Sequence, residues 1–329
     1  MRHTSALAAL ATLSLAAVAA CSPQEDETLV IYSGRNENLV APVLEQLEGA
    51  VGVPVEVRYA SSSELAAQLL EEGDATEADL FFSQDAGALG ALAKADMLSA
   101  LDASVVDVVA PEYRDEERRW VATSGRARVL AYDPEQVPQI DEITSIDQLL
   151  QPEFTGTIGY APSNASFHAF VTALRVDRGE DGAREWLEAF ADQQPVAFEN
   201  NNAVLDAVDG GQVAVGLINH YYWFQKVAEM GDISAQIHYL SSDDPGALVN
   251  VAGVGVLAGS DNREAALRAV EFLLSPEAQQ YFVDETSEYP VIPDVSHDLP
   301  PLTDRHRIDL NDLDSLEETL ALLDEVGLT

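Results

Sequence analysis

The chain has a single cysteine, few basic residues and little long hydrophobic sequence, and each shortage excludes a class of protein. Cys21 is the only cysteine among 329 residues, so the fold has no internal disulfide. Lysine and arginine together number 17 against 57 aspartates and glutamates, a formal charge of −40. Such a charge repels phosphate backbones and argues against a nucleic-acid partner. After the N-terminal segment, no apolar run is long enough to cross a bilayer.

The first 20 residues have the pattern of a secretory signal, with a short basic start and an apolar, uncharged core. They end in the letters V-A-A-C at positions 18–21, which resemble the bacterial lipobox, whose cysteine becomes the first mature residue and carries lipid. An ordinary cleaved signal that happens to contain a cysteine is the alternative. We expect a signal peptide over 1–20, lipidation of Cys21 and a short tether over 21–27. The mature protein would then be soluble apart from its lipid, anchored at the cell surface or in the periplasm.

Short apolar runs alternate with helical patterns along the mature chain. Residues 29–33, 53–59 and 79–82 are typical of strands, and each is followed by a small polar loop and an amphipathic segment. This alternation predicts an α/β fold with largely parallel sheets flanked by helices. Polar loops after successive strands meet at one edge of such a sheet, where open α/β sheets bind ligands.

Two longer extended stretches, residues 120–132 and 246–257, suit crossover connections between two such units. We therefore expect two lobes with a cleft between them. Lobe 1 would comprise residues 28–127 and 251–300, and lobe 2 residues 128–250. A C-terminal helical region, 301–329, would pack on lobe 2.

The segment Asn219-His220-Tyr221-Tyr222-Trp223 follows an apolar run that is typical of a buried strand, and it precedes a helical pattern. On the turn from strand into helix, neighbouring side chains can converge, so both phenols can face one point. A deprotonated phenol is a hard oxygen donor that suits Fe(III) far better than soft metals. Core packing, or a stacking platform for a sugar or another organic ligand, is the plainer interpretation of these aromatic residues.

The loop at residues 161–166 lies between a predicted strand and a predicted helix. Ser166 stands near the helix start, where unpaired backbone amides carry positive partial charge, so this loop is a candidate anion cradle. Asparagines 200–202 precede another helix. Helix capping alone would also explain these serine and asparagine residues.

Several motifs together resemble the periplasmic ferric-binding proteins, the substrate-binding components of bacterial iron(III) ABC importers. The matching pieces occur in the family's order along nearly the whole mature chain: VIYSGR at 30–35, ADLFF at 78–82, SGRARV at 124–129, NHYYW at 219–223, DPGALV at 244–249 and EYP at 288–290.

The resemblance implies Fe(III) coordination by Tyr221 and Tyr222 and a synergistic anion, carbonate or phosphate, close to the iron. The positions that match the family's anion loop and its side-chain donors are Asn164, Ala165, Ser166, Asn201 and Asn219. A monomer that delivers ferric ion or a small ferric complex to an ABC permease is the implied role.

The chain departs from the family pattern at two positions. Asn36 stands where several members have a histidine ligand, and Gln84 where some have a glutamate. Because Fe(III) prefers about six hard ligands, anions, water or a further tyrosine would have to complete the site. Candidates for that tyrosine are Tyr32, Tyr59 and Tyr160.

Arg35 and Arg126 are the candidates for neutralising a bound anion through bidentate hydrogen bonds, and structural ion pairs are the alternative for each. His220 is expected to pack beside the tyrosines or support them from behind.

We therefore expect a lipid-anchored receptor that captures Fe(III). The runner-up is the same fold with an organic, phosphonate or thiamine-type ligand, which the loss of the histidine and glutamate ligands favours. A secreted hydrolase is the third possibility, but the chain has no G-x-S-x-G, H-E-x-x-H or P-loop motif to support one. We expect no enzyme activity.

Overall fold

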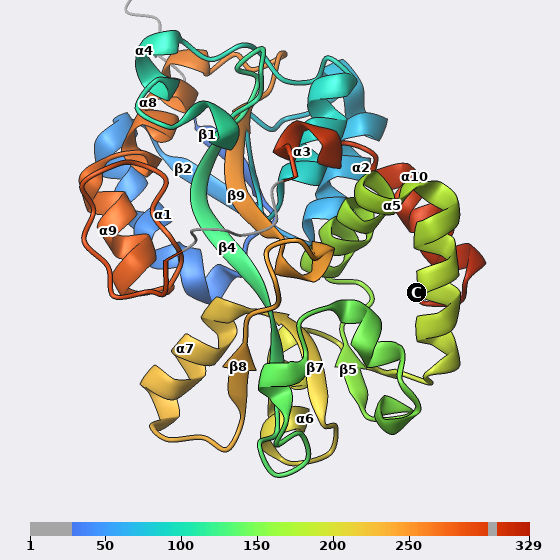
Figure 1. Cartoon of the computed structure of the whole chain (residues 1–329). Coiled ribbons are helices and arrows are strands. Elements are labelled where there is room, and N and C mark those ends of the chain that lie inside the picture. Colours follow the sequence, from blue (N-terminus) through green and yellow to red (C-terminus); the bar gives the residue numbers. More distant parts are fainter. Residues whose placement is uncertain (1–27, 302–307) are drawn as a thin grey trace, which may run out of the picture.

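The computed structural model describes residues 28–301 and 308–329. Its strands form two groups, an upper and a lower one in Figure 1, that share the long strand β4 (Val121–Tyr132). We call the upper group lobe 1 and the lower group lobe 2. Helices flank both groups, so each lobe is an α/β layered unit.

Lobe 1 contains three parallel strands, then one strand antiparallel to them, and then β4, which is antiparallel to that fourth strand. Their spatial order is β2 (Val55–Tyr59), β1 (Leu29–Ser33), β3 (Leu80–Ser83), β9 (Val249–Val256) and β4. The helices of this lobe are α1 (Glu37–Val51), α2 (Ser62–Glu72), α3 (Ala86–Lys94), α4 (Ala103–Val106), α8 (Arg263–Leu273) and α9 (Pro276–Asp284).

Lobe 2 is built on the second half of β4, which pairs with antiparallel β7 and β8. Beyond β7, β5 pairs in parallel with β7, and β6 pairs in parallel with β5. The lobe 2 strands are β7 (Val215–Asn219), β5 (Ile158–Tyr160), β6 (Val196–Ala197) and β8 (Gln236–His238). Its helices are α5 (Ala165–Asp192), α6 (Asn201–Asp209) and α7 (His220–Met230).

Short 3-10 helices connect several of these elements. They are η1 (Gly73–Ala75), η2 (Pro111–Tyr113), η3 (Ile140–Glu142), η4 (Ile146–Leu150), η5 (Pro152–Phe154) and η6 (Pro245–Ala247).

The two crossover strands run side by side between the lobes. Antiparallel pairing joins β4 to β9 from Val121 to Ala127, and from Arg128 onward β4 pairs with β7 instead. The extended stretches expected at 120–132 and 246–257 are therefore the strands that connect the lobes (Figure 1).

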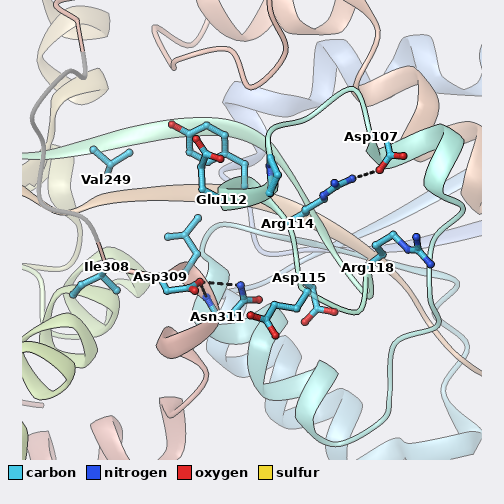
Figure 2. A pocket seen from close by; sticks show the side chains of 13 residues that line it. Asp107, Glu112, Arg114, Asp115, Arg118, Val249, Ile308, Asp309 and Asn311 are labelled. Carbon is cyan, nitrogen blue, oxygen red and sulfur yellow. Dashed lines mark hydrogen bonds and ion pairs between the residues drawn. The ribbon is translucent and has the colours of Figure 1, made fainter.

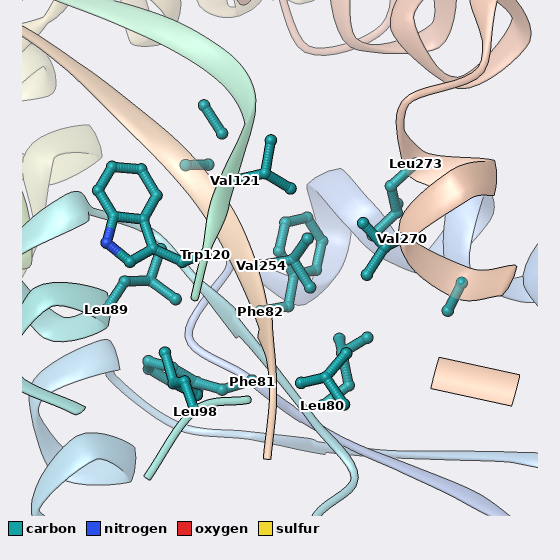
Figure 3. Close-up of a cluster of buried hydrophobic side chains, with 14 of the residues drawn as sticks. Leu80, Phe81, Phe82, Leu89, Leu98, Trp120, Val121, Val254, Val270 and Leu273 are labelled. Atoms are coloured by element: carbon teal, nitrogen blue, oxygen red, sulfur yellow. The ribbon is translucent and has the colours of Figure 1, made fainter. Parts of the chain in front are cut away.

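Side chains on both faces of the lobe 1 sheet are buried. Successive residues of a strand point to opposite faces, and in Figure 3 Phe82 lies toward Val270 of α8, whereas Phe81 lies with Leu98 on the other side. Trp120, at the start of β4, is fully buried in the same cluster. This core makes lobe 1 a stiff support for the loops at its strand ends.

Local sequence explains where helices α1 and α2 begin. The Asn36 side chain caps α1 by accepting the Asn38 amide, and α1 ends at Gly52, whose φ of 74° is left-handed. Ser61 and Glu64 form a reciprocal capping box at the start of α2. Both helices therefore start immediately after a strand of lobe 1, with their N-termini at one sheet edge.

The C-terminal segment contacts both lobes. Leu310 and Leu313, in the 3-10 helix η7 (Leu310–Leu313), lie in the lobe 1 core, and Leu322 and Leu323, in α10 (Leu316–Glu325), lie in a lobe 2 core. The expectation was that the whole of 301–329 packs on lobe 2. The structure differs because the chain breaks at Asp314 and Ser315, so the two halves pack on different lobes.

Candidate functional site

The tyrosine pair, Tyr221 and Tyr222, lies in the first turn of α7, immediately after β7. The two side chains are buried, with exposures of 2% and 5%, and their rings stack with centroids 4.2 Å apart. Neither hydroxyl makes a hydrogen bond to a residue within 28–301 or 308–329. Burial, and next the neighbouring Tyr222, raise the pKa of Tyr221 well above its usual value. Two adjacent phenols without partners are therefore held side by side at the strand end.

A buried ion pair lies close to this pair. The Arg35 Nη2 atom is 2.9 Å from both carboxylate oxygens of Glu288, and the Ser124 hydroxyl donates to Glu288 Oε2 at 2.6 Å. Burial alone would raise the pKa of Glu288, but the charges of Arg35 and Arg126 and these hydrogen bonds more than offset it, so the pKa is lowered. Glu288 therefore holds a negative charge in the interior that neutralises Arg35.

Arg126 is a buried arginine with fewer partners. Its side chain is 1% exposed, and Nε and Nη1 find no hydrogen-bond acceptor in the described part of the chain. Its charge acts on the pKa values of Tyr221 and Glu288, which places it near both. Buried guanidinium groups are normally paired, so this one provides donors and positive charge toward the phenols.

His220 fills the space behind the tyrosines. It is fully buried, accepts the Ala127 amide on Nδ1 at 3.2 Å, and lies against the Tyr289 ring with centroids 4.8 Å apart. Burial lowers the pKa of His220 to about 4, so its ring is neutral at neutral pH. The ring therefore supports the α7 start against the crossover strand.

The predicted anion loop is an intact helix start with its side chains bonded to one another. Asn164 caps α5 by accepting the Ser166 amide and hydroxyl, and Asn201 Nδ2 donates to the Ser166 hydroxyl at 3.0 Å. The Asn219 side chain, at the start of α7, makes no capping hydrogen bond. The Ala165 amide, first in the helix, has no partner within the helix.

A cavity of about 270 Å³ separates the two lobes at this edge, and we call it the cleft cavity. Lobe 1 and lobe 2 contribute seven residues each, and the lining is Gly34, Arg35, Asn36, Ala60, Ser61, Ser62, Gln84, Ser163, Asn164, Ala165, Glu199, Asn200, Asn202 and Tyr222. All three polar loops expected after strands β1, β2 and β3 are represented.

The structure brings most predicted site residues to this place. Those that line the cleft cavity are Arg35, Asn36, Gln84, Asn164, Ala165 and Tyr222. Those that lie outside its lining, and are buried, are Arg126, Ser166, Asn201, Asn219 and Tyr221. Of the second group, Tyr221 stacks on Tyr222, a lining residue, so both phenols lie at this cavity.

The additional tyrosine candidates lie elsewhere. Tyr32 bonds Arg58 and Glu72 through its hydroxyl, and Tyr160 packs on Phe167 in the lobe 2 core. Neither of them, nor Tyr59, lines the cleft cavity.

Three buried residues had no role assigned from the sequence. Glu288 pairs with Arg35, and Ser124 donates to Glu288. Both residues occur in motifs that match the family, but neither had been proposed as a site residue. Arg128 Nη1 donates to the Ser166 carbonyl at 3.0 Å, and burial lowers the pKa of Arg128 to about 9. For Arg128, the available signal in the sequence was a charged residue within a largely apolar strand.

A larger cavity, of about 850 Å³, lies on lobe 1 (Figure 2). Carboxylates outnumber guanidinium groups on its wall, and Arg114 is already paired with Asp107. None of the predicted site residues lines it. Size alone therefore does not identify the functional site, and the cleft cavity is the better candidate because the predicted residues meet there.

Comparison with known proteins gives consistent matches over the full chain. Residues 75–316 match the family model described as "Bacterial extracellular solute-binding protein". The Fe(3+)-binding periplasmic protein of Serratia marcescens is 32% identical over 329 residues, covering 98% of this chain and 97% of that protein. The major ferric iron-binding protein of Neisseria meningitidis serogroup B is 31% identical over 328 residues, covering 96% and 97%.

Solved structures agree with the sequence matches. Iron-bound HitA from Pseudomonas aeruginosa superimposes with a TM-score of 0.85 at 31% identity, covering 91% of this chain and 99% of HitA. The ferric binding protein from Campylobacter jejuni gives 0.82 at 25% identity, with 91% and 99% covered. The two-lobed α/β fold and the resemblance to ferric-binding proteins are confirmed. The chain therefore belongs to the bacterial extracellular solute-binding proteins and is similar to members that are named for binding ferric iron.

Proposed function

We propose that this chain captures Fe(III) in the cleft cavity and that Tyr221 and Tyr222 are its protein ligands. The observation that carries the proposal is Arg126, a buried cation with unpaired donors beside two buried phenols without partners. Once Fe(III) displaces the phenol protons, the tyrosine pair becomes anionic, and Arg126 supplies compensating positive charge. In the absence of a cargo that makes the phenols anionic, Arg126 interacts through its charge with the buried Glu288 and Asp85 carboxylates, but its Nε and Nη1 donors have no acceptor among the described residues.

The remaining coordination positions call for an anion. Among the described residues no group of three histidine, cysteine, aspartate or glutamate side chains could hold a metal ion. Asn36 and Gln84 offer only neutral amides toward the cavity. We therefore assign the synergistic anion, carbonate or phosphate in the simplest case, to the α5 start, with Asn164, Ala165 and Ser166 at the anion and Asn201 and Asn219 supporting it. Arg126 adds positive charge from β4, and Arg35, whose charge is neutralised by Glu288, lines the cavity beside the anion.

Capture would work by closing the lobes, with residues 28–127 and 251–300 moving against 128–250. The cargo makes contacts to both lobes only in the closed state, so binding shifts the population toward closure. No helix in 28–301 or 308–329 is long and apolar enough to span a membrane.

We further propose that the protein is a monomer that delivers its cargo to an ABC permease. After removal of a signal peptide over 1–20, lipid on Cys21 would tether it to the membrane. Cys21 and the tether lie outside the described residues. The role is binding and transport, without turnover.

The test is a visible absorption titration of the metal-stripped mature protein with ferric citrate, with and without bicarbonate. We expect a broad tyrosinate-to-iron charge-transfer band that saturates near one equivalent. Tyr221→Phe and Tyr222→Phe should each weaken or abolish the band, because each removes one phenolate ligand.

Tyr160→Phe is the matched control, since Tyr160 is equally buried but packs in the lobe 2 core. This variant should keep the full band. Absence of any band in the unmodified protein would overturn the ferric proposal and make phosphonates, thiamine and intact iron chelates the next ligands to test.

A further inference from the structure

The C-terminal segment, residues 308–329, joins the two lobes in addition to the crossover strands β4 and β9. Its first half, η7, places two leucines in the lobe 1 core, and its second half, α10, places two leucines in a lobe 2 core. Asp314 and Ser315 separate the two halves. In Figure 1, α10 lies beside α5 and close to α3. We call residues 308–329 the C-terminal bridge.

Arg175 of α5 binds the C-terminal bridge at the point where the bridge passes from one lobe to the other. Its Nη1 atom donates to the Ser315 carbonyl at 2.9 Å, and to the Ser315 and Thr319 hydroxyls at 2.8 Å each. Its Nε atom donates to Glu180 at 3.0 Å, and the Thr172 and Thr319 hydroxyls share a buried hydrogen bond of 2.7 Å. Because Arg175 is only 8% exposed, little water competes for these bonds, and they fix α10 on α5.

Helix α5 also contacts lobe 1 directly. Its Ala169 and Ala173 lie in the lobe 1 core, whereas Phe167 and Phe170 lie in a lobe 2 core. The two alanines are one turn apart and therefore share a face of the helix. Through this region α5 contacts both α3 and η7. The C-terminal bridge and α5 together therefore form one continuous contact between the lobes.

The same helix connects this contact with the cleft cavity. Asn164 and Ala165, at the start of α5, line the cavity, and Arg175 lies about 15 Å farther along the helix at 1.5 Å per residue. Both lobes line this cavity, whose volume of about 270 Å³ equals roughly nine water molecules. The contacts of α5 and the bridge therefore belong to an arrangement in which the two walls of the cleft lie close together.

We propose that the C-terminal bridge, held by Arg175, sets the angle between the lobes and thereby the affinity of the cleft for its cargo. Contacts that are made in one arrangement stabilise it relative to the others, so the bridge raises the closed fraction of the metal-free protein. The apparent affinity for a cargo that binds the closed state increases with that fraction. Arg175 is a positioning residue, since it touches α10 and does not line the cavity. The effect on Fe(III) affinity rests on the proposed function, whereas the effect on the shape of the metal-free protein does not.

The first experiment inserts a flexible glycine-serine linker of about five residues between Asp314 and Ser315. Each half of the bridge keeps its own core contacts, but the two halves no longer constrain each other. The same linker between Gly231 and Asp232 is the matched control, because both residues are exposed and connect two elements of lobe 2. Small-angle X-ray scattering of the metal-free mature proteins measures the radius of gyration, and chelator competition measures the affinity for Fe(III).

We expect the linker after Asp314 to give a larger radius of gyration than the control linker and to lower the affinity for Fe(III) about tenfold. Equal radii in the two insertion variants would overturn the proposal. A larger radius with unchanged affinity would overturn the link between the bridge and cargo capture.

A point substitution tests the same contact from α5. Arg175→Met removes the donors to Ser315 and Thr319, and it should change the radius and the affinity in the same direction as the linker after Asp314. Arg178→Met is the matched control, since Arg178 lies on the same helix and pairs with Asp147 within lobe 2. Equal effects of the two substitutions would overturn the positioning role of Arg175.

The radius of the metal-free protein separates this inference from the ferric proposal. If ferric citrate produces no tyrosinate band but the linker after Asp314 enlarges the radius, the ferric proposal fails and the role of the bridge in setting the shape stands. If the band forms and the two insertion variants have equal radii, the ferric proposal stands and the role of the bridge fails.

Discussion

Two buried arginines near the tyrosines have opposite surroundings. Arg35 is paired with Glu288 and held by Ser124, whereas Arg126 has two unpaired nitrogen donors. A buried charge without hydrogen bonds destabilises a fold, and removal of one partner of a buried ion pair is strongly destabilising because the other charge is left uncompensated. The same substitution should therefore act differently at the two positions.

For Arg126→Met, we expect the melting temperature of the metal-free protein to change little, because removal of two buried donors without acceptors is offset by the lost attraction between Arg126 and the buried Glu288 and Asp85 carboxylates. Affinity for Fe(III) should fall at least about tenfold, since the phenolates lose their compensating cation. Differential scanning calorimetry and chelator competition measure the two effects.

Arg35→Met is the contrasting case. It leaves the Glu288 carboxylate buried without its partner, and we expect a loss of about 3 kcal/mol in the free energy of unfolding of the metal-free protein. Urea denaturation measures this loss. Equal stability of the Arg35 and Arg126 variants would contradict our assignment of the paired and unpaired roles.

Iron binding should weaken as the pH falls. The pKa of Tyr221 lies well above its usual value, so at neutral pH its hydroxyl keeps its proton until iron displaces it. Each displaced proton changes the apparent affinity about tenfold per pH unit, so two phenols give up to about a hundredfold per pH unit, or about ten-thousandfold between roughly pH 6 and 8. Chelator competition at several pH values gives the slope. A pH-independent affinity would exclude phenolate ligands, and Tyr160→Phe should keep the slope of the unmodified protein.

At the scale of whole elements, helix α3 and the 3-10 helix η7 pack unusually closely. A Cβ atom added at Gly87 would lie 2.8 Å from the Leu313 carbonyl oxygen, and one at Gly90 would lie 2.9 Å from the Asp314 Cβ atom. Two glycines one turn apart therefore let the C-terminal segment reach the lobe 1 core, while α10 continues onto lobe 2.

Gly87→Ala should lower the free energy of unfolding by about 2 kcal/mol, because overpacking against a backbone carbonyl outweighs the better helix propensity of alanine. Gly49→Ala, in α1, is the matched control. Nothing lies within 4 Å of its added Cβ, so it should raise the free energy of unfolding by roughly 0.5–1 kcal/mol. Urea denaturation of both variants measures these changes in the free energy of unfolding. A stabilising effect of Gly87→Ala would contradict the close packing of α3 and η7.

At the scale of the whole molecule, the cleft cavity lies between two lobes, each with its own core, that β4 and β9 connect. Relative motion of the lobes would bend these strands and the break between η7 and α10, and it would also shift α5, whose Ala169 and Ala173 lie in the lobe 1 core. Cargo that touches both walls of the cavity should therefore act on the shape of the entire protein.

Ferric loading should reduce the radius of gyration measured by small-angle X-ray scattering, because bound cargo favours the closed lobes. The double variant Tyr221→Phe with Tyr222→Phe should show no reduction under the same conditions. A radius that is identical with and without iron in the unmodified protein would contradict closure by cargo.

The net charge of −40 should make stability depend on salt. Raising sodium chloride from about 0.05 to 1 M screens repulsion among the carboxylates, and we expect the melting temperature to rise by several degrees. At about pH 4.5, where carboxylates are partly neutralised, the same salt change should have a smaller effect. A salt effect of equal size at both pH values would contradict a charge origin.

Local features of this protein are determined by the sequence itself. The strand-to-helix junction at Tyr221, the polar loops after β1, β2 and β3, and the two long crossover strands were all predictable, because periodicity and helix capping depend on neighbouring residues. The family motifs added the expected ferric ligands.

Only the tertiary structure decided which distant residues meet. Arg35 and Glu288 pair across 253 positions, and nothing in either local sequence selects the other. The packing of the elements also decides whether Arg126 is paired and whether Tyr160 faces the cleft or the core. It likewise brings the C-terminal segment into contact with both lobes. Burial and hydrogen-bond partners are properties of the assembled fold, whereas the capping and periodicity that predicted the site's edge are properties of the chain.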